Sequence, residues 1–308
     1  MTDDLAIDVQ GMTKRFGALT AVNHVDLRVR TGEICGFLGP NGSGKTTFIR
    51  MLCGLLRPDA GSGTCLGHNV ITESEAIKRQ VGYITQRFSF WEDLSISENL
   101  DFVARMYSLR NRREAVRESL ERLGLEERKD QLAGELSGGW KQRLALAACM
   151  IHNPKLLLLD EPTAGVDPKA RREFWEEIHE LAGQGLTFLI ATHYMDEAER
   201  CHRLAFITEG GLLSHGTAAE VIGQAHLTTW SVVGPDLLKL TEQLRDLPGV
   251  EQAVLFGNTV HVSGDDGAAL ESSIAPFRKG QYEWNRIDSG LEDVFIHLME
   301  RSKDRVSQ

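Results

Sequence analysis

The segment Gly39-Pro-Asn-Gly-Ser-Gly-Lys45-Thr46 fits the pattern G-x-x-x-x-G-K-[ST] in full. Glycines let the backbone curl so that successive N–H groups, from Gly42 to Thr47, point at phosphate oxygens. Lys45 then reaches the β- and γ-phosphates, the Thr46 hydroxyl ligates Mg²⁺, and a helix beginning near Lys45 adds its positive dipole end. The pattern predicts a nucleoside triphosphate site. Its residues are Gly39, Pro40, Asn41, Gly42, Ser43, Gly44, Lys45, Thr46 and Thr47.

Two carboxylates, Asp160 and Glu161, follow the apolar run Leu156–Leu159. In open α/β sheets, ligands gather at the carboxyl ends of the strands. We expect Asp160 to be a partner of Mg²⁺ and Glu161 to be the general base that polarises an attacking water. On its own, such a pair after a strand is also compatible with a solvated loop. The glycine-rich phosphate motif in the same chain favours the catalytic interpretation.

A mainly parallel sheet would bring these residues together. The runs Ile34–Leu38, Lys155–Leu159 and Thr187–Ala191 are short, apolar and end in polar or glycine-rich turns, which indicates strands buried on both faces. Strands alternate with helices over about residues 5–225, and the first helix is expected over Lys45–Leu56. Residues 95–150 read as mostly helical, so the fold class is α/β with an inserted helical subdomain.

The pattern of expected strands and helices changes after residue 225. Strands and helices are expected in the order β-α-β-β-α-β, which matches a small α+β domain of the ferredoxin-like type. An amphipathic helix over Leu291–Met299 follows. We therefore expect two domains, 1–225 and 226–308. The expected elements of the second are Thr229–Val233, Asp236–Leu247, Val250–Phe256, Thr259–Ser263, Ala268–Ala275 and Tyr282–Ile287.

Composition narrows the function classes. The net charge of -10 disfavours nucleic acid as a partner, because an acidic surface repels phosphates. The five cysteines lack C-x-x-C spacing, which is typical of reduced thiols in a cytosolic protein. No apolar run approaches the roughly 18 residues of a membrane span, and the acidic start Met1–Leu5 is unlike a signal peptide. Any membrane role would then require a partner.

Further residues carry a family resemblance. Leu136-Ser137-Gly138-Gly139 lies between the phosphate motif and Asp160 and resembles the signature motif of ABC-transporter ATPases. The other elements of that family occur in the same order, over about residues 5–225. They are Phe16 at the position of the adenine-stacking aromatic, Gln86 in the loop after a strand, Asp167 in Ala-Gly-Val-Asp-Pro, and His193 after a strand.

The resemblance implies roles for these residues. The cofactors would be ATP and Mg²⁺, with Gln86 sensing the metal and the attacking water, and His193 donating to the γ-phosphate. Two chains would pair head to tail, so that Ser137, Gly138 and Gly139 of one close over the triphosphate held by the other. Asp167 would contact the partner across the dimer. Independently, Asp167-Pro168 is expected to cap a helix, with Pro at its first position.

Trp140 departs from the family pattern, which most often has Gln at this position. An indole cannot accept a hydrogen bond. It could instead close over ribose or pack at the dimer seam. Because Lys141-Gln142-Arg143-Leu144 is family-like, we expect the function to be retained.

Two segments resemble exporters of drugs, antibiotics, lipids or polysaccharides: Gln86–Leu100 and Gly290–Leu298. The resemblance implies a homodimer or paired ATPase on a separate integral-membrane permease, at the cytoplasmic face of the cell membrane. Phe88, Phe90 and Trp91 are the candidate permease contacts; core packing is the alternative for all three.

Rival functions remain at this point. One is a non-transport ABC ATPase of translation or repair, which the single ATPase half and the acidity disfavour. A second is an importer ATPase whose C-terminal domain is regulatory. A third is an inactive scaffold that binds nucleotide. It is disfavoured because the expected catalytic set is present: Lys45, Thr46, Asp160, Glu161 and His193.

Overall fold

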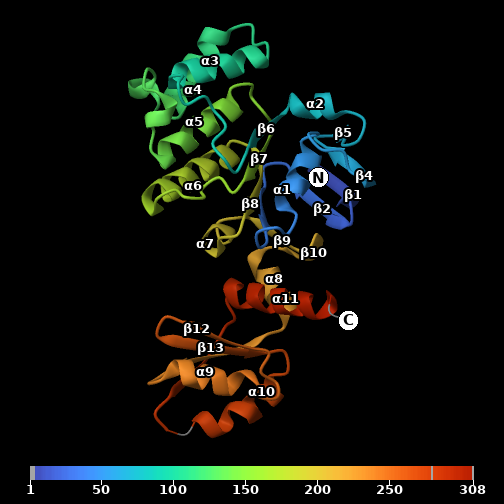
Figure 1. The fold of residues 1–308 in the computed structure, drawn as a ribbon, viewed down its shortest axis with the longest axis vertical. Helices are drawn as coiled ribbons and strands as arrows, with labels where there is room; N and C mark the ends of the chain where they lie inside the picture. The colour runs from blue at the N-terminus through green and yellow to red at the C-terminus, as the bar shows by residue number, and fades with distance from the viewer. Residues whose placement is uncertain (1–3, 279, 307–308) are drawn as a thin grey trace. The chain divides into compact units, whose positions relative to one another are not determined.

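The computed structural model describes residues 4–278 and 280–306, which form two compact units that meet between Leu213 and Ser214. The sequence placed the boundary after residue 225. The difference is the helix α8 (Ala218–Ala225), which buries Val221 and contacts α11 (Leu291–Val306) of the second unit (Figure 1). α8 therefore belongs with the second unit.

A sheet of order β10-β9-β3-β8-β7-β6 forms the centre of the first unit. β3, β7 and β8 consist entirely of buried residues, and the pairs β3–β8, β7–β8, β3–β9 and β6–β7 are parallel. The carboxyl ends of these strands consequently share one edge, as the apolar runs predicted. The strands are β3 (Ile34–Leu38), β6 (Val81–Ile84), β7 (Leu156–Asp160), β8 (Thr187–Thr192), β9 (Arg203–Thr208) and β10 (Gly211–Gly216).

A second, antiparallel sheet of order β2-β1-β4-β5 shares a hydrophobic core with β3 and α1 (Lys45–Leu52). The rings of Phe37 and Phe48 stack within that core at 4.9 Å between centroids. The expected helix Lys45–Leu56 was too long, because Gly54 adopts φ 70° and leaves Leu55 exposed. The other elements here are β1 (Leu5–Phe16), β2 (Leu19–Arg30), β4 (Ala60–Cys65), β5 (His68–Asn69) and α2 (Ser74–Lys78).

The block 95–150 is helical, as its spacing predicts. Figure 1 shows α3, α4 and α5 together on one side of the first unit, away from β1, β2 and β4. Ser95 and Glu98 form a capping box at the start of α3: the Glu98 N–H donates to Ser95 Oγ, and the Ser95 N–H donates to Glu98 Oε2. The bounds are α3 (Ile96–Met106), α4 (Arg112–Arg122), η1 (Glu126–Arg128), η2 (Ala133–Glu135) and α5 (Gly138–Met150), followed by α6 (Pro168–Gly183) and α7 (Met195–Ala198).

The second unit has the predicted β-α-β-β-α-β order, with an antiparallel sheet of order β12-β13-β11-β14. Leu240 of α9 and Leu270 of α10 pack on the face that carries Trp230 and Val262. His261 lies on the opposite face and contacts Asp293 of α11. The elements are β11 (Thr228–Val233), α9 (Leu237–Arg245), β12 (Gln252–Phe256), β13 (Thr259–Gly264), α10 (Gly267–Ile274), η3 (Ala275–Arg278) and β14 (Glu283–Ile287).

All five cysteines are buried and carry free thiols. Burial raises the pKa of the Cys53 thiol to about 11 and that of Cys65 to about 12. Within residues 4–278 and 280–306, no helix combines the length and the apolar character that crossing a bilayer requires.

Candidate nucleotide site

The phosphate loop joins β3 to α1 and has a shape that depends on glycine. Gly42 and Gly44 adopt φ 82° and 103°. A Cβ on Gly44 would lie 2.2 Å from the carbonyl oxygen of Ala21, so no side chain fits there. The backbone therefore packs against β2 and turns into α1 at Lys45. This strand–loop–helix arrangement is the context that the motif requires.

Lys45 is folded back over the loop. Its Nζ donates to the carbonyl oxygens of Gly39 (2.7 Å) and Pro40 (3.0 Å) and lies 3.4 Å from Glu161 Oε1. The side chain is only 4% exposed. Burial lowers the pKa of Lys45, and the nearby Glu161 carboxylate opposes that shift. The structure thus brings the motif lysine directly against the predicted general base.

Three of the predicted side chains contact Glu161. Besides Lys45, Gln86 Nε2 donates to its Oε2 at 3.1 Å, and His193 Nδ1 lies 3.3 Å from the same oxygen. Glu161 is 7% exposed, and its N–H bonds the carbonyl of Ala191 on β8 at 2.9 Å. The ends of β6, β7 and β8 and the phosphate loop therefore meet at one carboxylate.

Asp160, the last residue of β7, is buried and accepts a hydrogen bond from the Thr46 hydroxyl. Burial raises the pKa of Asp160, and the Thr46 bond opposes the rise. Its Oδ1 is buried and lacks a hydrogen-bond partner among the described residues. An adjacent hydroxyl and carboxylate with an unused oxygen fit a hard cation that prefers oxygen ligands, such as Mg²⁺.

Sequence reasoning missed Glu197, which braces the same edge of the sheet. Its buried carboxylate accepts hydrogen bonds from Thr192 at the end of β8 (2.6 Å) and from Thr163 after β7. The N–H of Tyr194 in turn bonds the Thr192 hydroxyl at 3.1 Å. Glu197 therefore fixes the two loops that carry Glu161 and His193. No spacing rule identifies it, since Thr163 lies 34 residues away in the chain.

Phe16 ends β1 and is 49% exposed. Its ring has Lys14 Nζ 5.7 Å from the centroid. The exposed ring face is compatible with the stacking role that the resemblance implies.

The signature segment, Leu136–Gly139, opens α5. Ser137 is the N-cap, and a Cβ on Gly139 would lie 2.6 Å from Ala170 Cβ, so α5 packs closely on α6. The expected cap of α6 is confirmed, with Asp167 Oδ1 accepting from the N–H groups of Lys169 and Ala170. A hollow of about 290 Å³ at these two helix starts is lined by Ser137, Gly139 and Asp167. Its lining does not include Lys45 or Glu161, so the signature segment is not part of the Glu161 cluster of the same chain.

Two guanidinium groups lie over the Trp140 indole, Arg128 at 4.7 Å and Arg143 at 5.3 Å from the ring centroid. Arg143 also donates to Glu173 of α6 at 3.1 Å. The indole therefore ties η1 to the first turn of α5.

A groove of about 860 Å³ on the first unit is lined mainly by apolar side chains, with Glu75, Lys78 and Arg79 also in its wall. Its lining includes Leu55, Phe90 and Met106; Leu55 is 58% and Met106 69% exposed. Of the other predicted contacts, Phe88 is partly buried with its ring 5.5 Å from Phe90, and Trp91 is exposed with its ring 4.2 Å from Phe102. Leu55 and Met106 are not among the contacts predicted from the sequence.

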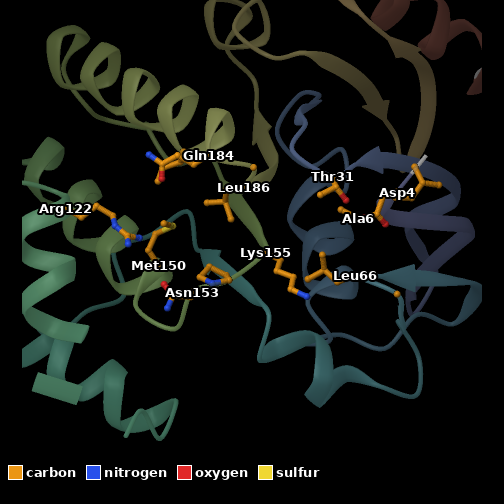
Figure 2. Close-up of a pocket in the computed structure, with 15 residues that line it drawn as sticks. Asp4, Ala6, Thr31, Leu66, Arg122, Met150, Asn153, Lys155, Gln184 and Leu186 are labelled. Atoms are coloured by element: carbon orange, nitrogen blue, oxygen red, sulfur yellow. The ribbon is translucent and has the colours of Figure 1, made fainter. Parts of the chain in front are cut away.

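Another hollow, of about 590 Å³, lies at the opposite edge of the parallel sheet (Figure 2). Arg122, Met150 and Gln184 in its lining stand at the ends of α4, α5 and α6. Helix carboxyl ends carry negative partial charge, which disfavours a triphosphate there. None of the predicted site residues lines it.

The glycine loop between β3 and α1, together with the acidic pair that ends β7, defines a P-loop nucleotide-binding cassette. Residues 22–164 match the family model described as ABC transporter. The Nod factor export ATP-binding protein I of Burkholderia thailandensis is 38% identical over 299 residues, covering 96% of this chain and 97% of that protein. The chain belongs to the family of ABC-transporter ATP-binding proteins.

Other similar proteins are also named as parts of ABC transporters. The probable multidrug ABC transporter ATP-binding protein YbhF of Escherichia coli is 41% identical over 305 residues, which is 96% of this chain but 52% of YbhF. The chain thus spans about half the length of that relative. The structure of cbiO1 from Clostridium perfringens, part of the ABC transporter complex cbiONQ, matches with a TM-score of 0.66 at 28% identity, over 72% of this chain and 92% of that one. The ADP conformation of the cassette MJ1267 matches at a TM-score of 0.62 and 26% identity, over 70% and 92%.

Proposed function

We propose that this chain binds and hydrolyses ATP as the motor subunit of an exporter. The observation that carries the proposal is the Glu161 carboxylate, which is buried and in contact with Lys45, Gln86 and His193. Such a carboxylate is suited to take a proton from a water that attacks the γ-phosphate. The exporter assignment is supported by relatives named for multidrug transport and for Nod factor export.

In the proposed reaction, ATP draws Lys45 away from the carbonyl oxygens of Gly39 and Pro40 and onto its β- and γ-phosphates. The adenine stacks on Phe16. Glu161 orients the attacking water and accepts its proton, while His193 donates to the γ-phosphate. The water oxygen bonds to the γ-phosphorus as the bond from that phosphorus to the β–γ bridging oxygen breaks, so that ADP and phosphate leave. Mg²⁺, held by Thr46 and Asp160 with Gln86 nearby, would neutralise charge on the phosphate oxygens.

The proposed active form is a head-to-tail dimer. Ser137, Gly138 and Gly139 open a 13-residue helix, whose free N–H groups and dipole favour a phosphate of the partner chain. Asp167 caps α6 beside that end and would contact the partner. Because the signature segment stands apart from the Glu161 cluster of its own chain, a second copy is needed to complete each site.

The proposed membrane partner is a separate permease that presses against the groove lined by Leu55, Phe90 and Met106. Phe88, whose ring lies 5.5 Å from that of Phe90, and the exposed Trp91 are the further candidate contacts. Exposed apolar patches of this kind mark protein contacts. In this proposal the chain works at the cytoplasmic face of the cell membrane. Co-purification of a multi-span protein from membranes supports this function, whereas co-sedimentation with ribosomes would favour the translation rival.

The Glu161→Gln variant tests the central role. It should still bind ATP but lose about 10²–10⁴ in turnover, the usual contribution of a positioned general base. Unhydrolysed ATP should then hold two chains together. Phosphate release and size-exclusion mass with Mg²⁺ and ATP measure both effects.

Lys45→Ala is the matched control, since it removes the phosphate contact and should stay monomeric without tight ATP binding. Normal turnover by Glu161→Gln would exclude Glu161 as the base. A monomer that binds ATP but never pairs would refute the dimer.

A further inference from the structure

The aromatic loop, residues 87–95, runs beside the chain that leads into the signature segment. The N–H of Gly134 donates to the carbonyl of Glu92 at 2.9 Å, and the N–H of Ala133 donates to Leu94 at 2.9 Å. The N–H of Ile96 likewise bonds Gln131 at 3.0 Å. The two stretches therefore pair as a short antiparallel ribbon that ends three residues before Ser137.

The approach of Gly134 to Glu92 in this ribbon leaves little room for a side chain. A Cβ on Gly134 would lie 3.0 Å from the Glu92 carbonyl oxygen and 3.2 Å from Glu92 Cβ. A larger residue at this position would require Glu92 to shift by a few tenths of an ångström.

A side-chain contact repeats the same connection. Lys141, in the first turn of α5, donates from Nζ to Glu92 Oε1 at 3.0 Å, and its amine lies 5.1 Å from the centroid of Phe88. The N–H of Lys141 also bonds the carbonyl of Ser137 at 2.9 Å. Glu92 thus contacts both flanks of the signature segment, through its backbone to Gly134 before the segment and through its carboxylate to Lys141 after it.

We infer that Glu92 and Lys141 are positioning residues that make the aromatic loop and the signature segment move together. The inference rests on the proposed function, in which the loop faces a permease and Ser137 faces the partner's phosphate. A displacement of Phe88 would reach Ser137 through these short contacts. Coupling between two binding events is reciprocal, so ATP-driven pairing must also restrain the aromatic loop.

Hydrogen exchange in the Glu161→Gln background tests this without a permease. The exchange rates of the backbone amides in residues 88–94 are measured without and with Mg²⁺ and ATP. The slowing is the exchange rate without nucleotide divided by the rate with it. Glu92→Gln should reduce the slowing about two- to fivefold, the range that a partly exposed ion pair supports. Asp93→Asn is the matched control, a neighbouring exposed carboxylate in the same loop, and should retain it.

The Lys141→Met variant tests the other partner of the Glu92 ion pair. If Glu92 and Lys141 act through each other, the double variant should lose no more slowing than either single variant, because effects within one contact do not add. Gly134→Ala should also reduce the slowing.

Equal slowing in the Glu92→Gln and Asp93→Asn proteins would overturn the inference while leaving the proposed function intact. Additive losses in the double variant would overturn it as well. A Glu161→Gln protein that stays monomeric with ATP would refute the proposed dimer, and the inference with it.

Discussion

Glu161 combines three side-chain partners with an uncommon backbone conformation. Its φ of 49° lies in the left-handed region, which costs a non-glycine residue about 1–3 kcal/mol. The bond from its N–H to Ala191 and the contacts to Lys45 and Gln86 hold it there. Such strain persists where the surroundings over-determine it, and it clusters at functional sites. The backbone therefore supports the catalytic role proposed for this residue.

Trp140→Gln should retain ATPase activity, because the indole is engaged with Arg128 and Arg143 rather than being held free for a nucleotide. Removing two cation–π contacts should lower the free energy of unfolding by about 1–2 kcal/mol. Steady-state ATPase assays and denaturant unfolding measure the two effects separately.

Trp140→Phe keeps an aromatic face for both guanidinium groups and should restore most of the stability. Loss of activity in Trp140→Gln with stability unchanged would show that the indole acts on the nucleotide.

At the scale of helices and strands, the buried apolar strands could be predicted from the sequence. Ile34–Leu38 and Leu156–Leu159 are apolar on both faces, so the central parallel strands could be placed, and with them the edge that carries Asp160 and Glu161. Asp167-Pro168 is a local cap signal, which the structure confirms. These predictions succeeded because the signal lies within a few neighbouring residues.

Other elements depend on distant partners and could not be predicted. The antiparallel sheet of β1, β2 and β4 follows from pairing between Leu5–Phe16 and Ala60–Cys65, which no local pattern encodes. The contact of Glu92 with Lys141 and that of Glu197 with Thr163 join residues far apart in sequence. Sequence periodicity states which face is buried, but not what covers it.

The end of α5 carries a histidine whose protonation should affect stability. His152 stacks on Tyr107 at 3.8 Å, and burial lowers its pKa from the usual 6.5. The folded chain thus binds this proton less readily than the unfolded chain, so stability is full above about pH 6.5 and is lost as the pH falls from that value through the lower pKa of the folded state. Melting temperatures measured across this range should show the decline.

His152→Phe preserves the ring stack but cannot titrate, and it should flatten the pH dependence. His215→Gln, which removes an exposed histidine, should leave the dependence unchanged. An identical decline in the wild-type and His152→Phe proteins would exclude His152 as its source.

At the scale of the whole molecule, each unit has its own hydrophobic core, one around Phe37 and Phe48 and the other around Trp230 and Leu240. The predicted nucleotide residues all lie in the first unit. Scanning calorimetry of the Glu161→Gln protein should resolve two transitions. Mg²⁺ and ATP at about 100 times Kd should stabilise the first unit by about 2.7 kcal/mol.

The melting transition of the second unit should shift little, because this unit contains none of the predicted nucleotide-binding residues. A single transition that shifts as one would show that the units unfold together.

Burial of the cysteines affects how the chain can be labelled chemically. The buried cysteines are Cys35, Cys53, Cys65, Cys149 and Cys201. A maleimide reacts with an exposed thiolate, and these thiols are both shielded and hard to ionise. The native chain should therefore resist alkylation until it unfolds. One cysteine introduced on the surface would then accept a fluorophore or spin label at a known position, with every natural thiol left in place.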